Sequence, residues 1–137
     1  MKRTALTKLT TATLITAFGL ARAAMAADLP PASTKTGVTY ATDIKPIFDS
    51  SCVKCHSGDK PKAHLKLDTL ENALKGSKDG KVIAVGDSAK SYLVKCVAHV
   101  TSDQDSWMPP LHNKAGVKPL TAEQIGLIRA WIDQGAK

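Results

Sequence analysis

The sequence predicts a single all-α domain, and three observations support this fold class. The chain has 137 residues, a length that suits one domain. Four helical stretches are readable, and three of them carry apolar residues at the spacing of a helix that is buried on one side. No stretch alternates apolar and polar residues for more than a few positions, as a half-buried strand would. The composition, with 43% hydrophobic residues, is ordinary for a globular protein and excludes collagen-like, coiled-coil and wholly disordered chains.

The first predicted helix begins at Thr42 or Asp43, because either residue can cap a helix. Pro46 suits this helix only in the first turn, where amide groups lack helical partners. One face of the helix is apolar and consists of Ile44, Ile47 and Phe48.

The second and third predicted helices are bounded by local signals. The second covers 68–75, because Asp68 and Glu71 have the spacing of a capping box and Gly76 favours a helix end. The third begins after Ser88 and continues to about residue 99. Its apolar face consists of Leu93, Cys96, Val97 and Val100. A buried position in that face predicts that Cys96, the unpaired third cysteine, is a structural thiol rather than a redox or dimer-forming one.

The fourth predicted helix has the clearest boundaries. Thr121 and Gln124 form a capping box at its start, and Gly135 ends it. Its apolar face consists of Ile125, Ile128 and Ile132. Gly126 costs this helix about 1 kcal/mol relative to Ala, so we expect close approach by another helix at that position.

The first 26 residues have the pattern of a secretory signal peptide. Basic residues precede an uncharged, mainly apolar stretch over 9–21, and Ala24-Met25-Ala26 fits a signal peptidase site. An uncleaved anchor is the alternative, but this stretch of about 13 residues is shorter than the roughly 20 that span a bilayer. We therefore expect export to the periplasm or another exported location, with no stable membrane insertion after cleavage.

Removal of this segment changes the charge argument. The formal charge of the whole chain is +7, but 15 basic and 12 acidic residues remain after residue 26. The basic character therefore belongs mostly to the signal peptide and does not indicate a nucleic-acid partner. Residues 27–39 contain Pro, Ser and Thr without periodicity and are predicted to form a flexible leader. The folded domain is predicted to cover 40–137.

The string Cys52-Val53-Lys54-Cys55-His56 is the attachment signature of c-type haem. Two thiols three residues apart can each form a thioether with one vinyl group of the porphyrin, and the adjacent His56 can bind the iron. A thioredoxin-like redox pair is one alternative, but such a pair opens a helix, whereas this one follows a helix. A zinc site formed with His64 is the other alternative, although no second closely spaced ligand pair is present.

Met108 is the predicted second axial ligand of the iron. It is the only methionine after the signal peptide, and it lies in a long irregular segment, 101–120, directly before two prolines. A proline restricts the backbone of the preceding residue, so the thioether is presented from a stiff segment. A thioether is soft and uncharged and favours ferrous iron. Core packing is the alternative role of this methionine. The alternative ligands are His112, His99 and His64.

These motifs resemble the small c-type cytochrome domain that is widespread in planctomycetes and related bacteria, within the class I cytochrome c group. The resemblance covers residues 40–136. Its most specific parts are the C-x-x-C-H string and Met108-Pro109-Pro110, supported by Asp43–Phe48, Leu65–Asp68, Val85–Ser88, Ser91–Leu93 and Leu120–Ala136. It implies a cytochrome c-like fold of about four helices around one covalently bound haem c, with the first and last helices crossing. In that crossing, Gly126 would approach the helix that bears Phe48. The implied ligands are Cys52 and Cys55 for the porphyrin, and His56 and Met108 for the iron.

The predicted function is that of an exported electron carrier rather than an enzyme, and no catalytic residue is predicted. Its partners would be redox proteins, among them an exported dehydrogenase or oxidase. The lysines near the attachment motif, Lys54, Lys60, Lys62 and Lys66, would steer an acidic partner or simply form a solvated face. The alternative is a peroxide-reducing or gas-binding haem protein with an open sixth position. That function needs a distal acid and base, for which His112 and Arg129 are the available residues. Trp107 and Trp131 are predicted to pack in the core.

Overall fold

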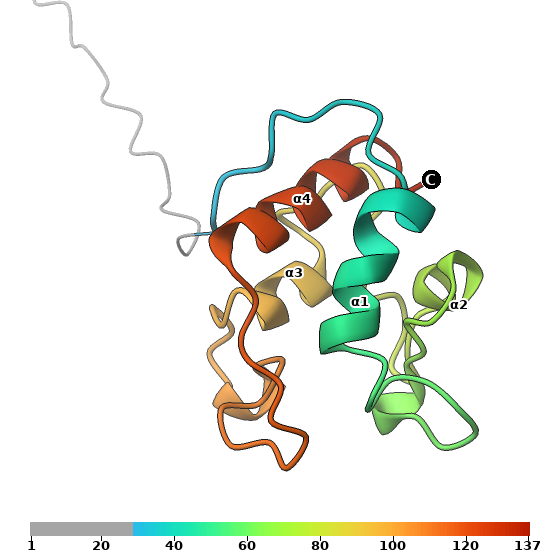
Figure 1. Cartoon of the computed structure of the whole chain (residues 1–137), viewed down its shortest axis with the longest axis vertical. Coiled ribbons are helices and arrows are strands. Elements are labelled where there is room, and N and C mark those ends of the chain that lie inside the picture. The colour runs from blue at the N-terminus through green and yellow to red at the C-terminus, as the bar shows by residue number, and fades with distance from the viewer. Residues whose placement is uncertain (1–28) are drawn as a thin grey trace, which may run out of the picture.

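The computed structural model describes residues 29–137, so the predicted signal peptide lies outside the described residues. This part of the chain contains four α-helices and no strand (Figure 1). The helices are α1 (Lys45–Ser51), α2 (Leu70–Lys75), α3 (Tyr92–Val97) and α4 (Ala122–Asp133). Three short turns of other helix types are η1 (Tyr40–Ile44), η2 (Lys62–His64) and η3 (Gln104–Ser106). The predicted all-α fold class is confirmed.

The first helical segment begins earlier than predicted. Its cap is Thr39, whose side chain accepts a hydrogen bond from the Thr42 amide at 3.3 Å. In return, the Thr39 amide donates to the Asp43 carboxylate at 3.0 Å. The prediction of a cap at Thr42 or Asp43 is therefore wrong, because both residues already belong to the first turn. Pro46 lies in the first turn of α1, as predicted.

The boundaries of the other helices follow the sequence signals to different degrees. The cap of α2 is Thr69 rather than Asp68. The Asp68 carboxylate instead accepts a hydrogen bond from the Asn72 side chain at 2.8 Å. Gly76 ends α2 as predicted. Helix α3 is shorter than predicted. The capping box of α4 is present in full, because Thr121 and Gln124 exchange hydrogen bonds between side chain and amide.

The core lies where α1 and η1 pack against α4. The rings of Phe48 and Trp131 meet edge to face, with centroids 6.3 Å apart, and Tyr40 contacts both rings. Phe48, Trp131 and Ile128 are completely buried. Trp131 is therefore a core residue, as predicted. This packing fixes the end of α1, from which the attachment motif continues.

The segment 29–39, predicted to be a leader, lies along α4 (Figure 1). The Ser33 amide donates to the Gly126 carbonyl at 2.9 Å, and Arg129 donates to the Pro30 carbonyl. A Cβ atom at Gly126 would lie 2.7 Å from the carbonyl oxygen of Pro31. The residue that approaches Gly126 is therefore in the leader, and the expected approach by the helix that bears Phe48 is wrong.

None of the helices within residues 29–137 is long and apolar enough to cross a bilayer.

Candidate functional site

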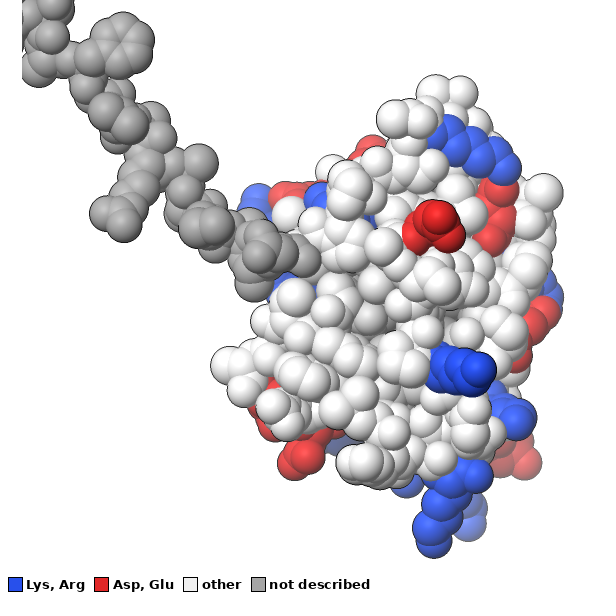
Figure 2. Space-filling model, turned by 60° about the vertical axis from the view of Figure 1, so that its left-hand side comes forward, with Lys and Arg blue, Asp and Glu red and all other residues white. Residues whose placement is uncertain are grey.

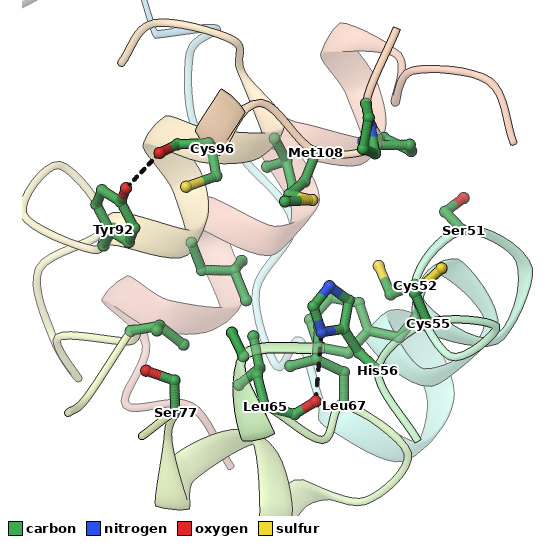
Figure 3. A pocket seen from close by; sticks show the side chains of 18 of the residues that line it. Ser51, Cys52, Cys55, His56, Leu65, Leu67, Ser77, Tyr92, Cys96 and Met108 are labelled. Atoms are coloured by element: carbon green, nitrogen blue, oxygen red, sulfur yellow. Dashed lines mark hydrogen bonds between the residues drawn. The ribbon is translucent and has the colours of Figure 1, made fainter. Parts of the chain in front are cut away.

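A cavity of about 480 Å³ lies between the end of α1, helix α3 and the segment before α4. Its walls are mainly apolar and include Leu65, Leu67, Val82, Leu93, Val97 and Leu120. The four residues predicted from the motifs, Cys52, Cys55, His56 and Met108, all line this one cavity (Figure 3). Residues 56 positions apart in the sequence, Cys52 and Met108, therefore converge here because the chain folds around the cavity.

The end of α1 places the two motif cysteines side by side. Cys52 is the residue that caps this end, and its amide donates to the Phe48 carbonyl at 2.8 Å. Its own carbonyl accepts from the amides of Cys55 at 3.1 Å and His56 at 3.0 Å, which closes a turn. Figure 3 shows both thiols at one side of the cavity.

The environment of Cys52 argues against a thioredoxin-like pair. Burial raises the pKa of its thiol to about 12, so the thiol is uncharged at neutral pH. Redox-active cysteines have the opposite property, a low pKa, and usually sit at the start of a helix. Cys52 instead lies at the end of one.

His56 is buried, with 8% of its surface exposed. Its Nδ1 atom lies 3.3 Å from the Leu65 carbonyl oxygen, and the His56 carbonyl accepts from the Leu67 amide at 2.8 Å. These contacts orient the ring, and Figure 3 shows its other nitrogen directed into the cavity. Burial lowers the pKa of His56, which favours the neutral imidazole that binds metals.

Met108 enters the cavity from the wall opposite His56 (Figure 3). Its amide donates to the carbonyl of Cys96 at 3.0 Å, which ties this irregular segment to the end of α3. The following residue, Pro109, is buried. Met108 therefore faces His56 across the cavity.

The three alternative histidines do not line the cavity. His64 and His112 are exposed. His99 is half-buried, and its Nε2 atom lies 3.2 Å from the Met108 carbonyl oxygen. Within residues 29–137, no group of three or more His, Cys, Asp and Glu side chains is placed to hold a metal ion. His64 thus does not join the cysteines in the arrangement that a zinc site would need.

The third cysteine is buried as predicted, and it also lines the cavity. Burial raises the pKa of the Cys96 thiol. The sequence placed Cys96 on an apolar helix face, but that pattern cannot distinguish a wall of a cavity from a closed core. Of the tryptophans, Trp131 is in the core, whereas Trp107 is half-buried and stacks on His99.

A comparison with known families matches residues 52–112 to the family described as planctomycete cytochrome C. The matched segment is a planctomycete-type cytochrome c domain. The match includes all four predicted ligand residues. No curated protein and no solved structure matches the chain significantly. The match of this segment to the family implies a covalently bound haem c and, in general terms, electron transfer by haem.

The size and the lining of the cavity suit a covalently bound haem c. Its volume lies in the range of roughly 300–1,000 Å³ that is typical of sites for small molecules and cofactors. Its walls are apolar, the two motif thiols are neighbours on one side, and an imidazole and a thioether face each other across it. Imidazole and thioether are the donors that hold haem iron in cytochromes c. The residues therefore fit a haem c.

Sequence reasoning missed the part of the cavity wall that irregular segments form, although it placed Leu93 and Val97 on an apolar helix face. Val82, Leu65 and Leu67 come from irregular segments, where no periodicity marks a buried position. Tyr92 also lines the cavity, and its hydroxyl donates to the Ser106 side chain at 2.9 Å. Only the position of Leu65 and Leu67 shortly after the attachment motif gave a signal, through the family resemblance.

Proposed function

We propose that this protein is an exported mono-haem cytochrome that transfers single electrons between redox proteins. Cys52 and Cys55 would hold the porphyrin through thioethers, and His56 and Met108 would bind the iron. The observation that carries this proposal is the convergence of the two thiols, the imidazole and the thioether on one apolar cavity. One haem is proposed because the sequence contains one C-x-x-C-H string.

The residues around the cavity would each have a defined role. When bound, the haem iron supplies a one-electron redox centre. The Leu65 carbonyl holds the imidazole of His56 in one orientation, as partners of metal-bound histidines usually do. The thioether of Met108 stabilises the reduced state, because it is a soft and uncharged donor. The apolar walls exclude water from both donors.

A carrier is favoured over an enzyme with an open sixth position by the placement of two residues. His112 is exposed and Arg129 lies on α4, so neither lines the cavity where a distal acid or base would act. The Arg129 guanidinium donates to the Ser88 hydroxyl at 3.1 Å and to the Pro30 carbonyl. Its role is therefore to join the leader to the domain.

The same proposal includes export of the chain and contact with a redox partner. The signal peptide over 1–26 would direct the chain to the periplasm, leaving a mature chain with the leader 27–39 and the cytochrome domain 40–137. Lys54 is exposed at the rim of the cavity, where it could approach an acidic partner such as an exported dehydrogenase or oxidase. The face seen in Figure 2 is largely uncharged, with Lys and Arg side chains gathered toward its lower right edge, so any steering would rest on local charges.

The visible and near-infrared spectra of the purified ferric and ferrous protein test this proposal. We expect a six-coordinate, low-spin c-type haem, a near-infrared band of ferric iron bound to methionine sulfur, and no rapid binding of carbon monoxide. A ferrous protein that binds carbon monoxide rapidly without any mutation would instead be an open-site haem protein.

A further inference from the structure

The proposed iron ligand Met108 lies in a segment with little regular structure, so its position requires other contacts. Both backbone polar groups of Met108 are engaged. Its amide donates to the Cys96 carbonyl at 3.0 Å, and its carbonyl oxygen lies 3.2 Å from Nε2 of His99. Cys96 and His99 both lie at the end of α3, so this helix end holds the backbone of Met108 from two directions.

The ring of His99 is itself held in place. It stacks on the indole of Trp107, with centroids 5.0 Å apart and planes inclined by 8°. The indole nitrogen of Trp107 in turn donates to the Thr101 carbonyl at 3.2 Å. The backbone of His99 has a φ of +56°, in the left-handed region that side chains other than those of glycine, Asn, Asp and His rarely adopt. This conformation turns the chain at the end of α3 and directs the ring back toward residues 107 and 108.

We propose that His99 is a positioning residue for the Met108 ligand. Its Nε2 donates to the Met108 carbonyl, and its stacking on Trp107 fixes the direction of that bond. The sulfur of Met108 is thereby held in the cavity at a lower cost in conformational freedom. This role rests on the proposed function, because it requires Met108 to bind the iron. It differs from the role considered for His99 from the sequence, that of an iron ligand.

Two substitutions separate the hydrogen bond from the backbone conformation. His99→Asn keeps a residue that tolerates the left-handed region, but its shorter side chain does not reach the Met108 carbonyl. His99→Gln keeps an N–H donor at about the position of Nε2. His112→Asn is the matched control, because it removes an exposed histidine of the neighbouring segment that does not line the cavity.

The measurement is the dissociation constant of imidazole for the ferric full-length secreted holoprotein, since imidazole binds the iron only after Met108 leaves. The near-infrared methionine band and the helical circular dichroism are recorded on the same samples. We expect His99→Asn to bind imidazole roughly 2- to 10-fold more tightly, which is the effect of losing one hydrogen bond. His112→Asn should remain within twofold of the wild type, His99→Gln should bind imidazole less tightly than His99→Asn does, and the helical signal should not change.

Three results would contradict the proposal, and they are distinguishable. If the wild type shows the methionine band and His99→Asn binds imidazole no more tightly, Met108 is the ligand but His99 does not position it. If the wild type has no methionine band, the ligation by Met108 is wrong, and the role of His99 is wrong with it. Equal tightening in His99→Asn and His112→Asn would also contradict a specific role for His99.

Discussion

Four sulfur-bearing side chains line the cavity, and their environments give them different chemistry. Cys52 and Cys96 are uncharged at neutral pH because burial raises the pKa of each thiol, to about 12 for Cys52. Cys55 is exposed at the rim of the cavity. Met108 carries no titratable proton and faces the imidazole of His56. The proposed function gives the thioethers to the motif pair and the bond to iron to Met108, which leaves packing to Cys96.

Replacement of Met108 by Ala should change the redox properties of the protein. The iron would lose its soft ligand, and water, His or Lys would replace it. Because harder ligands favour ferric iron, the reduction potential should fall by on the order of 100 mV, a fraction of the range of about 0.8 V that axial ligands span. Redox titration and the near-infrared spectrum provide the measurement.

The control for this substitution is Met108→His, which should give a six-coordinate haem with a lower potential if the segment reaches the iron. Carbon monoxide should bind readily to Met108→Ala. An unchanged spectrum and potential in Met108→Ala would mean that Met108 only packs, and His112 would then be the first residue to replace.

Replacement of Cys96 by Ala should affect stability but not the haem spectrum. The side chain is 7% exposed and packs at the end of α3, so its removal leaves a small cavity. We expect a loss of about 1–2 kcal/mol in the free energy of unfolding, measured by denaturant titration of the holoprotein. A native disulfide-linked dimer that disappears in this variant would show that the thiol has a pairing role instead.

At the scale of elements, the leader is attached to α4 by several bonds that join distant parts of the chain. Ser33 and Arg129 supply two of them, and the side chain of Gln134 donates to the Lys35 carbonyl at 2.8 Å. The amide of Val38 donates back to Gln134 at 3.2 Å. The leader therefore covers the face of α4 that bears Gly126.

Replacement of Gly126 by Ala tests this contact. Alanine is favoured over glycine in a helix by about 1 kcal/mol, but its Cβ would lie 2.7 Å from a backbone oxygen that cannot rotate away. Overpacking costs about 1–3 kcal/mol, so we expect a net loss of stability of up to about 2 kcal/mol. Limited proteolysis should cut the segment before residue 38 more rapidly.

The control is Glu123→Ala, an exposed residue in the first turn of α4, which should leave the cleavage rate unchanged. If Gly126→Ala stabilises the protein and cleavage does not change, the leader does not pack on α4 in solution.

The start of the first helical segment predicts a pH dependence. A hydrogen bond from Lys35, and then one from the Thr39 amide, hold the pKa of the Asp43 carboxyl below its ordinary value. The folded state thus binds this proton less readily than the unfolded state. Its stabilising contribution is present above about pH 4 and is lost as the pH falls through the folded pKa. Asp43→Asn should therefore lower the melting temperature at pH 6, and the difference from the wild type should shrink toward pH 3.

Asp49→Asn is the control for this prediction. It removes an exposed ion pair with Lys45, which should contribute little at any pH. A difference between Asp43→Asn and the wild type that stays constant from pH 6 to pH 3 would contradict the role of the Asp43 charge.

At the scale of the whole molecule, the sequence predicts the helices better than their caps. Local periodicity and the Thr121–Gln124 box are sufficient for α4, because all the necessary residues lie within one turn. At the N-terminal ends of the first and second helices, residues that are equally suited to cap a helix lie next to one another, as Asp68 and Thr69 do. Tertiary contacts decide between such neighbours, so the predicted caps of the first and second helices were wrong.

The sequence predicts those residues of the candidate site that lie in short motifs. Cys52, Cys55 and His56 form one string, and Met108 was identified by its neighbouring prolines. The walls of the cavity and the contact between His99 and Met108 depend on how irregular segments fold. The partner of Gly126 could not be predicted for the same reason, because Pro31 lies in a segment without periodicity.

The mass of the intact purified protein after denaturation tests the central claim most directly, because only a covalently bound haem remains with the polypeptide. We predict the mass of residues 27–137 plus one haem, and the mass of the bare chain when Cys52 and Cys55 are both replaced by Ala. A wild-type protein, produced in a host that attaches haem to exported cytochromes, whose mass is that of the polypeptide alone would contradict the assignment.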